Sequence, residues 1–232
     1  IPVMDAPTFY ERATRRLHIE EITPGWFIFA SGFRLSGPRR AVKRLFDVCA
    51  SLAGLALAAP LFPLIALGIR LDSPGPVIFR QERTGLGGRS FMLLKFRTMR
   101  QDAEAGSGPV WARQHDPRVT ALGRFLRQTR LDELPQLLNV LAGDMSLVGP
   151  RPERPEFIRL LKTSIPFYSE RHSVKPGVTG WAQVRYPYGA SVQDALEKLR
   201  YDLYYIKNQS FLLDMEIMFR TIGVVISRCG AR

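Results

Sequence analysis

Cysteine and histidine are scarce in this chain of 232 residues, and their placement excludes two common kinds of stabilising site. The two cysteines, Cys49 and Cys229, lie 180 positions apart, so they form neither a disulfide framework nor a metal-binding spacing, which fits a reducing compartment. The three histidines, His18, His115 and His172, are scattered, which argues against a zinc site.

The opening residues are polar and mixed and contain no hydrophobic segment, so we do not expect them to be a cleavable secretory signal. The sequence begins at Ile1 rather than Met, so we expect a piece of a longer protein or a processed product. Its length suits one domain with a sizeable core, or a domain with extensions.

Acidic residues are in deficit: 33 Lys and Arg stand against 21 Asp and Glu, which gives a net charge of +12. This excess of positive charge indicates an anionic partner: a nucleic acid, an anionic membrane surface or a phosphate-bearing substrate. Composition alone does not choose among these three.

One long apolar run is present, from Val48 to Ile69, where 22 positions carry no charge. A helix of roughly 20 such residues can span a bilayer. Pro60 and Pro63 lie near its middle, however, and each removes a backbone donor and kinks a helix. Basic residues flank both ends, before the run at Arg39, Arg40, Lys43 and Arg44, and after it at Arg70, Arg80 and Arg83.

A crossing helix normally has its basic flank on the cytoplasmic side only, so positive charge at both ends favours a re-entrant helix that breaks near Ala59 and Pro60 and returns. A kinked transmembrane helix and a buried core helix remain as alternatives. Ser51 is a candidate partner for carbonyl groups freed by the break. Asp47 is expected to pair with Lys43 or Arg44, in a structural role.

The remaining pattern predicts an α+β fold that is mostly helical. Residues 77–81 and 90–96 are expected to be strands of a small β-hairpin, joined by a glycine turn at 85–88 that is a weak candidate for a phosphate loop. Helices are expected at 122–129, 133–141, 153–161, from Ser191 to about 208, and 211–226, the last as an amphipathic helix at a membrane surface.

The most informative stretch runs from Arg127 to Glu153. Asp132 and Glu133 are adjacent carboxylates before an apolar helix, with Arg127 upstream and Arg151 downstream. Arginines neutralise phosphate oxygens, and a carboxylate can hold a divalent metal or attack phosphorus. The spacing alone favours a simpler role, in which Asp132 is only the N-cap of the helix and Glu133 lies in its first turn.

Four motifs in one order carry a family resemblance: residues 95–99 (KFRTM), 131–136 (LDELPQ), 146–153 (SLVGPRPE) and 175–180 (KPGVTG). With the preceding residues 43–47 (KRLFD) and the proline-broken apolar helix, the chain from about residue 39 resembles the bacterial sugar transferases called monotopic phosphoglycosyl transferases. A departure is Ala59 before Pro60, where the family often has serine.

The resemblance implies transfer of a sugar-1-phosphate from a UDP-sugar to polyprenyl phosphate (undecaprenyl phosphate), with release of UMP, to initiate exopolysaccharide or another membrane-linked glycan. It implies a covalent intermediate on Asp132, with Mg²⁺ held by Asp132 and Glu133. For Glu133 it leaves an acid–base role as the alternative to a magnesium ligand. By position, it also implies phosphate or substrate contacts from other residues, namely Lys95, Arg97, Arg127, Arg151, Thr179, Gln183 and Arg185.

The same resemblance implies three regions: a lead-in at 1–37 from an N-terminal region, a re-entrant membrane helix at 38–72, and a catalytic domain at 73–232 on the cytoplasmic face of the bacterial inner membrane. Membrane lipids are implied as partners, and larger relatives suggest a homodimer. Two alternatives are a catalytically idle scaffold of a glycan assembly complex and a nucleic-acid-binding protein, which the spread of the basic residues disfavours. The sequence does not identify the sugar.

Overall fold

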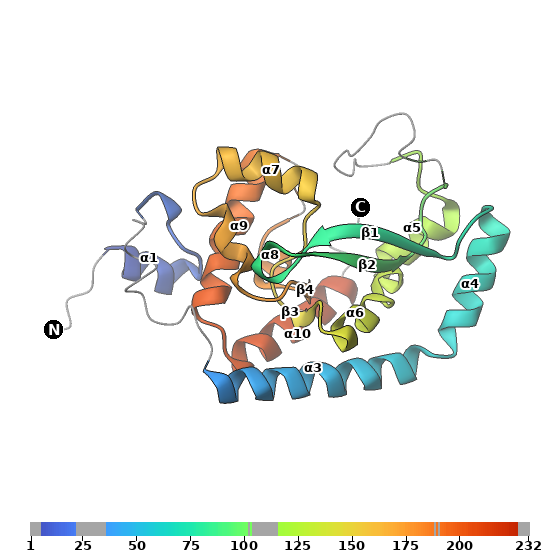
Figure 1. The fold of residues 1–232 in the computed structure, drawn as a ribbon, viewed down its shortest axis with the longest axis horizontal. Coiled ribbons are helices and arrows are strands. Elements are labelled where there is room, and N and C mark those ends of the chain that lie inside the picture. The colour runs from blue at the N-terminus through green and yellow to red at the C-terminus, as the bar shows by residue number, and fades with distance from the viewer. Residues whose placement is uncertain are drawn as a thin grey trace.

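The computed structural model describes residues 6–21, 36–101, 103, 116–187, 189 and 191–226. Most of them are helical (Figure 1). The helices and strands, in chain order, are α1 (Ala6–Thr14), η1 (Ile19–Glu21), α3 (Gly37–Ala58), α4 (Leu61–Asp72), β1 (Ile78–Thr84), η2 (Leu86–Gly88), β2 (Ser90–Phe96), α5 (Ala121–Gln128), η3 (Leu131–Glu133), α6 (Gln136–Ala142), β3 (Ser146–Val148), α7 (Pro155–Ser164), η4 (Tyr168–Ser173), β4 (Gly177–Thr179), α8 (Trp181–Arg185), α9 (Val192–Lys207) and α10 (Phe211–Ile226). The expected mostly helical fold with a hairpin is confirmed.

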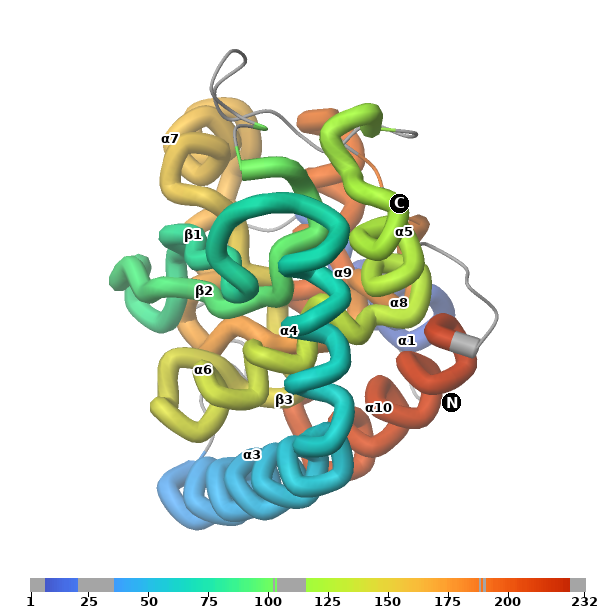
Figure 2. Tube along the Cα trace, turned by 90° about the vertical axis from the view of Figure 1, so that its right-hand side faces the viewer, coloured from blue at the N-terminus to red at the C-terminus, as the bar shows by residue number. Residues whose placement is uncertain are grey.

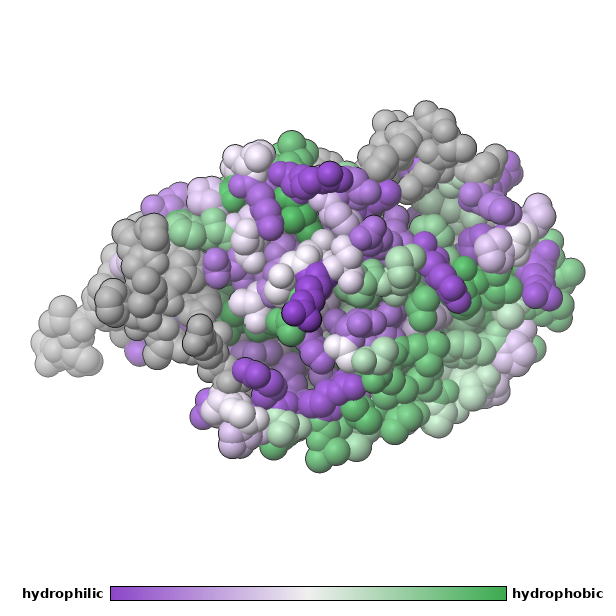
Figure 3. Space-filling view, viewed as in Figure 1, coloured by the Kyte–Doolittle hydropathy of each residue, from purple (hydrophilic) through white to green (hydrophobic). Residues whose placement is uncertain are grey.

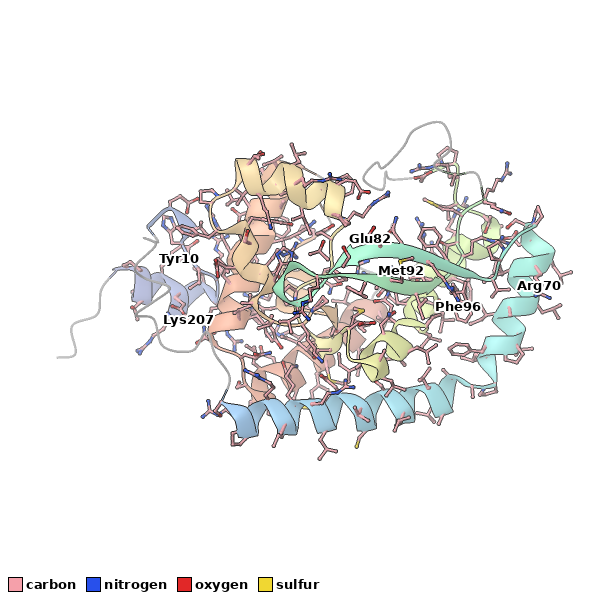
Figure 4. The ribbon with its side chains drawn as sticks, in the orientation of Figure 1. Tyr10, Arg70, Glu82, Met92, Phe96 and Lys207 are labelled. Atoms are coloured by element: carbon pink, nitrogen blue, oxygen red, sulfur yellow. The ribbon has the colours of Figure 1, made fainter. Side chains whose placement is uncertain are left out.

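The hairpin pairs β1 with β2 in antiparallel register, from Ile78 opposite Phe96 to Thr84 opposite Ser90. Its turn takes positive φ at Gly87 and Gly88, which glycine adopts without steric cost. These glycines therefore shape a turn, as the sequence favoured. Figure 4 shows Glu82 and Met92, which are paired across the hairpin, and Phe96 at the end nearer α4.

A second sheet, which the sequence did not predict, pairs the short strands β3 and β4 in parallel. Two further bonds continue the pairing, from Gly149 N to the Thr179 carbonyl and from Gly177 N to the Pro150 carbonyl, both at 2.9 Å. The two segments are so close that a Cβ atom on Gly149 would lie 2.4 Å from the Lys175 carbonyl oxygen. This pairing fixes the segment that leads to Arg151.

The main hydrophobic core lies among α6, β3, α8, α9 and α10, with Trp181, Leu203 and Ile217 fully buried in it. A smaller cluster joins α4, β2 and α5 through Ile69, Phe96 and Leu126. The main core also includes Leu17 and Ile19 from the region that the sequence assigned to a lead-in. Residues 6–21 therefore pack against this core, and the division into regions at residue 37 stays a prediction.

The apolar run is broken at Ala59 and Pro60, as expected, and α3 and α4 meet there at a bend of 62°. Pro63 lies in the first turn of α4, where its missing backbone donor is tolerated. The two helices form an L along one edge of the molecule (Figures 1 and 2). Among the described residues, no single helix meets the length and composition needed to cross a membrane, whereas this bent pair meets them jointly.

Two local expectations around α3 are wrong. Asp47 pairs with neither Lys43 nor Arg44, but accepts a hydrogen bond from the Leu147 backbone at 3.1 Å. Lys43 instead contacts Asp214 of α10 at 2.7 Å, and Arg44 donates to the last carbonyls of α6. The Ser51 hydroxyl is buried without a hydrogen-bond partner among the described residues, so it does not satisfy a carbonyl at the break. These contacts tie α3 to the domain and confirm a structural role for Asp47.

The outer faces of α3 and α4 are strongly apolar and exposed. The hydropathy surface shows one hydrophobic expanse over these two helices (Figure 3). The large exposed apolar side chains on them are Val42, Leu45, Leu52, Leu57, Leu61, Leu64, Leu67 and Leu71. On α10, Leu212, Phe219 and Ile222 are exposed while Ile217 is buried. Contiguous apolar surface on this scale is typical of a protein or membrane contact.

Candidate active site

The acid pair lies in the 3-10 turn η3, between α5 and α6. Arg130 takes a left-handed conformation (φ 58°) that ends the preceding helical segment, and the Glu133 N–H donates to the Arg130 carbonyl at 3.1 Å. Helix α6 begins only at Gln136, with Pro135 at the N-cap position. Asp132 is therefore not the N-cap that spacing suggested, and the expected start of this helix at residue 133 was three residues early.

Glu133 is held by three cations. Its Oε1 atom lies 3.0 Å from Lys95 Nζ, 3.1 Å from Arg151 Nη2 and 3.5 Å from Arg130 Nη1. Burial alone would raise the pKa of Glu133, but the three cations outweigh it and hold that pKa well below its usual range. Glu133 is therefore an anion at neutral pH, fixed in place by groups from β2, from the residue before η3 and from the segment after β3.

Asp132 has the opposite electrostatic balance. It is 6% exposed, and burial raises its pKa; the Lys95 charge opposes this rise and the neighbouring Glu133 carboxylate adds to it. Its Oδ1 atom is buried without a hydrogen-bond partner among the described residues. A buried carboxylate oxygen without a partner is costly, which marks Asp132 as a group placed for a ligand or for chemistry.

The two carboxylates face a cavity of about 980 Å³. Lys95, Arg127, Arg151 and Gln183 line it, as the sequence predicted for a substrate site. The sequence reasoning did not assign another set of basic lining residues to the site, namely Arg80, Arg83, Arg100, Arg118, Arg130, Arg154, Arg171 and Lys198. Arg130 and Arg154 adjoin the motifs and could have been found there, whereas Arg171 and Lys198 carry no local signal.

Arg151 connects several parts of the site. Its guanidinium donates to Gln183 Oε1 at 3.0 Å and to Glu133 Oε1 at 3.1 Å, and its own carbonyl accepts from Arg171 at 2.9 Å. Arg171 in turn pairs with the buried Asp202 at 2.9 Å, where burial raises the pKa of Asp202 to about 6. The arrangement presents a fixed guanidinium beside the acid pair.

Three residues expected to contact substrate make other contacts within the protein. Arg97 borders the cavity, but its guanidinium donates hydrogen bonds to the carbonyls of Ile69, Ser73 and Pro74. It therefore caps the carboxyl end of α4. The Thr179 hydroxyl bonds that of Thr221 at 2.6 Å, and Arg185 lies over the Trp181 ring at 5.2 Å. Thr179 and Arg185 do not line the cavity, and a substrate contact from either stays a prediction.

The residues fit a magnesium ion only in combination with a substrate. The described residues include no cluster of three or more His, Cys, Asp or Glu side chains that could hold a metal alone. Mg²⁺, however, is commonly bound by one or two carboxylates together with substrate phosphates and water. The partner-free Asp132 oxygen beside Glu133 matches that kind of site.

Two buried carboxylates beside many guanidinium groups in one cavity define a site for chemistry on phosphate groups. Consistent with this, a sequence model described as "Bacterial sugar transferase" matches residues 38–228. The chain belongs to this family.

Several characterised relatives are similar over most of the chain. The UDP-N-acetylgalactosamine-undecaprenyl-phosphate N-acetylgalactosaminephosphotransferase of Aeromonas hydrophila is 43% identical over 233 residues, covering 100% of this chain and 54% of that protein. UDP-glucose:undecaprenyl-phosphate glucose-1-phosphate transferases are 45% identical in Escherichia coli (strain K12), covering 81% of this chain and 41% of that protein, and 47% identical in Caulobacter vibrioides, covering 84% and 74%. The chain thus spans about half the length of the first two relatives.

Proposed function

We propose that this chain transfers a sugar-1-phosphate from a UDP-sugar to polyprenyl phosphate, with Asp132 as the nucleophile. The observation that carries the proposal is the buried Oδ1 of Asp132, which has no hydrogen-bond partner among the described residues, in a residue that lines a cavity rich in cations. Membership of the family and the names of the relatives support the substrate classes. Undecaprenyl phosphate, which those names share, is the acceptor that we propose.

The proposed reaction has two displacements at one phosphorus atom. An Asp132 oxygen attacks the phosphorus that carries the sugar, and the bond from that phosphorus to the UMP oxygen breaks with its electron pair, which releases UMP. A phosphate oxygen of the polyprenyl phosphate then attacks the same phosphorus. The bond to Asp132 breaks, the carboxylate is regenerated, and polyprenyl-diphospho-sugar is the product.

The neighbouring residues have separate roles in this scheme. Lys95 opposes the rise in the pKa of Asp132 and so helps to keep the attacking carboxylate ionised. Arg151 and Arg127 would neutralise phosphate oxygens, which is supported by their position along the cavity and by the 2.9 Å hydrogen bond from Arg127 to Thr98. Glu133, with Asp132, would hold Mg²⁺, which when bound would neutralise charge on the diphosphate.

We further propose that α3 and α4 enter one leaflet of the bacterial inner membrane and return, with the catalytic domain on the cytoplasmic face. The 62° bend, the exposed leucines of both helices and the basic residues at both ends support this topology. It would place the acid pair close to the headgroup plane, where the phosphate of a polyprenyl lipid lies. Basic side chains near anionic lipid contribute about 1 kcal/mol each to such binding.

The test is release of UMP by the purified chain in vesicles that contain undecaprenyl phosphate. Because the named relatives differ in their sugar, the panel should include UDP-glucose, UDP-N-acetylgalactosamine, UDP-galactose and UDP-N-acetylglucosamine. We expect turnover with at least one donor, dependent on both Mg²⁺ and the lipid phosphate. Asp132→Asn should abolish it, while the control Asp144→Asn, at an exposed position outside the cavity, should retain it. Absence of UMP release with every donor would favour the idle scaffold.

A further inference from the structure

Residues 6–21, here called the N-terminal strap, dock on helices α8, α9 and α10, outside the part of the chain that matches the family. Leu17 and Ile19 are each 3% exposed in the main core, and the Leu17 N–H donates to the Arg200 carbonyl at 3.1 Å. We propose that the strap is a positioning element of the active site, because it holds α8 and thereby the Gln183 contact to Arg151. Its kinetic consequence rests on the proposed function.

The strap supplies the hydrogen-bond acceptor of a fully buried tryptophan. Trp181 opens α8, and its Nε1–H donates to the Arg15 carbonyl at 2.9 Å. Arg15 adopts a positive φ of 55°, and its N–H bonds the Glu11 carbonyl at 2.8 Å, so the end of α1 fixes this carbonyl. Since a buried donor without an acceptor is destabilising, the position of Trp181 depends on the strap.

The Arg15 side chain closes around the same tryptophan. Its guanidinium lies 4.9 Å from the centre of the Trp181 ring and forms two hydrogen bonds to Glu216 of α10, at 2.6 and 2.9 Å. Arg220, one turn further along α10, also bonds Glu216 and lies 5.6 Å from the ring centre. Trp181 is therefore held between the strap and α10.

Further ion pairs fasten the strap to α9. Arg16 contacts Glu197 at 3.0 Å, and Lys207 contacts Glu11 at 2.6 Å. Figure 4 shows Tyr10 of α1 and Lys207 on this side of the molecule. Partly exposed pairs contribute little individually, so the core side chains and the indole hydrogen bond are the main attachments.

A short path leads from α8 to the acid pair. Helix α8 has five residues, and so short a helix is held by its tertiary contacts rather than by its own helical propensity. Gln183 is two positions after Trp181, and its Oε1 accepts from Arg151, which also donates to Glu133. If the strap loosened, α8 would become more mobile and Gln183 would no longer hold Arg151 in its orientation beside Glu133.

Amide hydrogen exchange on the full chain tests the structural half of this proposal without requiring turnover. Arg15→Gln and Leu17→Ala change only the strap, and Leu213→Ala removes a similar side chain from the same core on α10. We expect exchange at Gln183 and Val184, whose N–H groups bond the Gly180 carbonyl, to accelerate about fivefold in the strap variants while α6 is unchanged. Unchanged exchange in α8, or the same acceleration in Leu213→Ala, would overturn the proposal.

Kinetics separate positioning from a general loss of stability. We expect Arg15→Gln to raise the KM for the UDP-sugar severalfold with little change in kcat, and to have no further effect in a Gln183→Ala background. Equal effects of Arg15→Gln in both backgrounds would contradict the path through Gln183. If the unmodified chain turns over no donor, the proposed function fails, whereas the exchange result still decides whether the strap holds α8.

Discussion

Replacing Lys95 with methionine tests the electrostatics of the acid pair. The Lys95 ammonium lies 3.0 Å from Glu133 Oε1, and both side chains are largely buried. At an effective dielectric constant near 20, unit charges at that distance attract by about 5.5 kcal/mol. Most of this attraction offsets desolvation, and a hydrogen bond to a charged group has a net value of about 1.5–3 kcal/mol. If the transition state uses this interaction, Lys95→Met should lower kcat about 10- to 150-fold.

The same substitution should shift the pH dependence. Burial raises the pKa of Asp132, and Lys95 is the charge that opposes this rise most strongly. Without Lys95 the pKa of Asp132 rises further, so a larger fraction is protonated and unable to attack. The acidic limb of kcat/KM should therefore move to higher pH in Lys95→Met and stay closer to that of the unmodified chain in Lys95→Arg.

The assay is UMP release measured across pH for the unmodified chain, both Lys95 variants and the control Lys162→Met, an exposed lysine outside the cavity. Thermal unfolding of each variant checks that the fold is retained. An acidic limb that stays in place or moves to lower pH in Lys95→Met would refute the reasoning. So would a kcat that remains within about threefold of the unmodified value.

Three other predictions follow from particular contacts. His172 is buried, and burial together with Arg171 and Lys162 lowers its pKa from 6.5 to about 4, so the unfolded chain binds more protons between those values. The free energy of unfolding should therefore fall by up to about 3 kcal/mol as pH drops from 6.5 to 4. Denaturant titrations should show a weaker pH dependence in His172→Gln. An equally steep dependence in that variant would contradict the lowered pKa of His172. Gly149→Ala should destabilise the fold by about 3 kcal/mol and lower kcat/KM, because its Cβ would lie 2.4 Å from the Lys175 carbonyl oxygen. An unchanged melting temperature in this variant would contradict the close approach of β3 and β4. In a background without Cys49 and Cys229, single cysteines at Arg39 and Ser73 should be labelled from the same side of sealed vesicles, whereas labelling from opposite sides would mean a crossing helix.

Local patterns predicted the elements well. The hairpin, the break at Ala59 and Pro60, and the capping box of Ser191 and Asp194 at the start of α9 all depend on neighbouring residues. The start of α6 was misplaced because Pro135 was read inside the helix, whereas it occupies the N-cap position. The parallel pairing of β3 with β4 joins segments about 30 residues apart and involves three residues each, too few to show alternation.

The site was partly predictable for a related reason. Motifs identified Asp132, Glu133, Lys95 and Arg151, which the structure brings together at the cavity. They could not distinguish Arg97 from Lys95, because strand alternation would put residues two apart on the same face. Strand β2 ends at Phe96, however, and Arg97 beyond it bonds the carbonyls that follow α4. The contacts of the strap could not be predicted from the sequence, because Leu17 and Ile19 acquire their partners from segments far along the chain.

The central claim is that Asp132 becomes covalently attached to the phosphosugar. The most direct measurement is mass spectrometry of the intact chain and of its peptides, after brief mixing with Mg²⁺ and a UDP-sugar that supports turnover, with polyprenyl phosphate left out. We predict a mass increase of one sugar phosphate on the peptide that contains Asp132, lost on addition of the lipid phosphate and absent in Asp132→Asn. UMP release without any adduct on Asp132, or full turnover by Asp132→Asn, would contradict it.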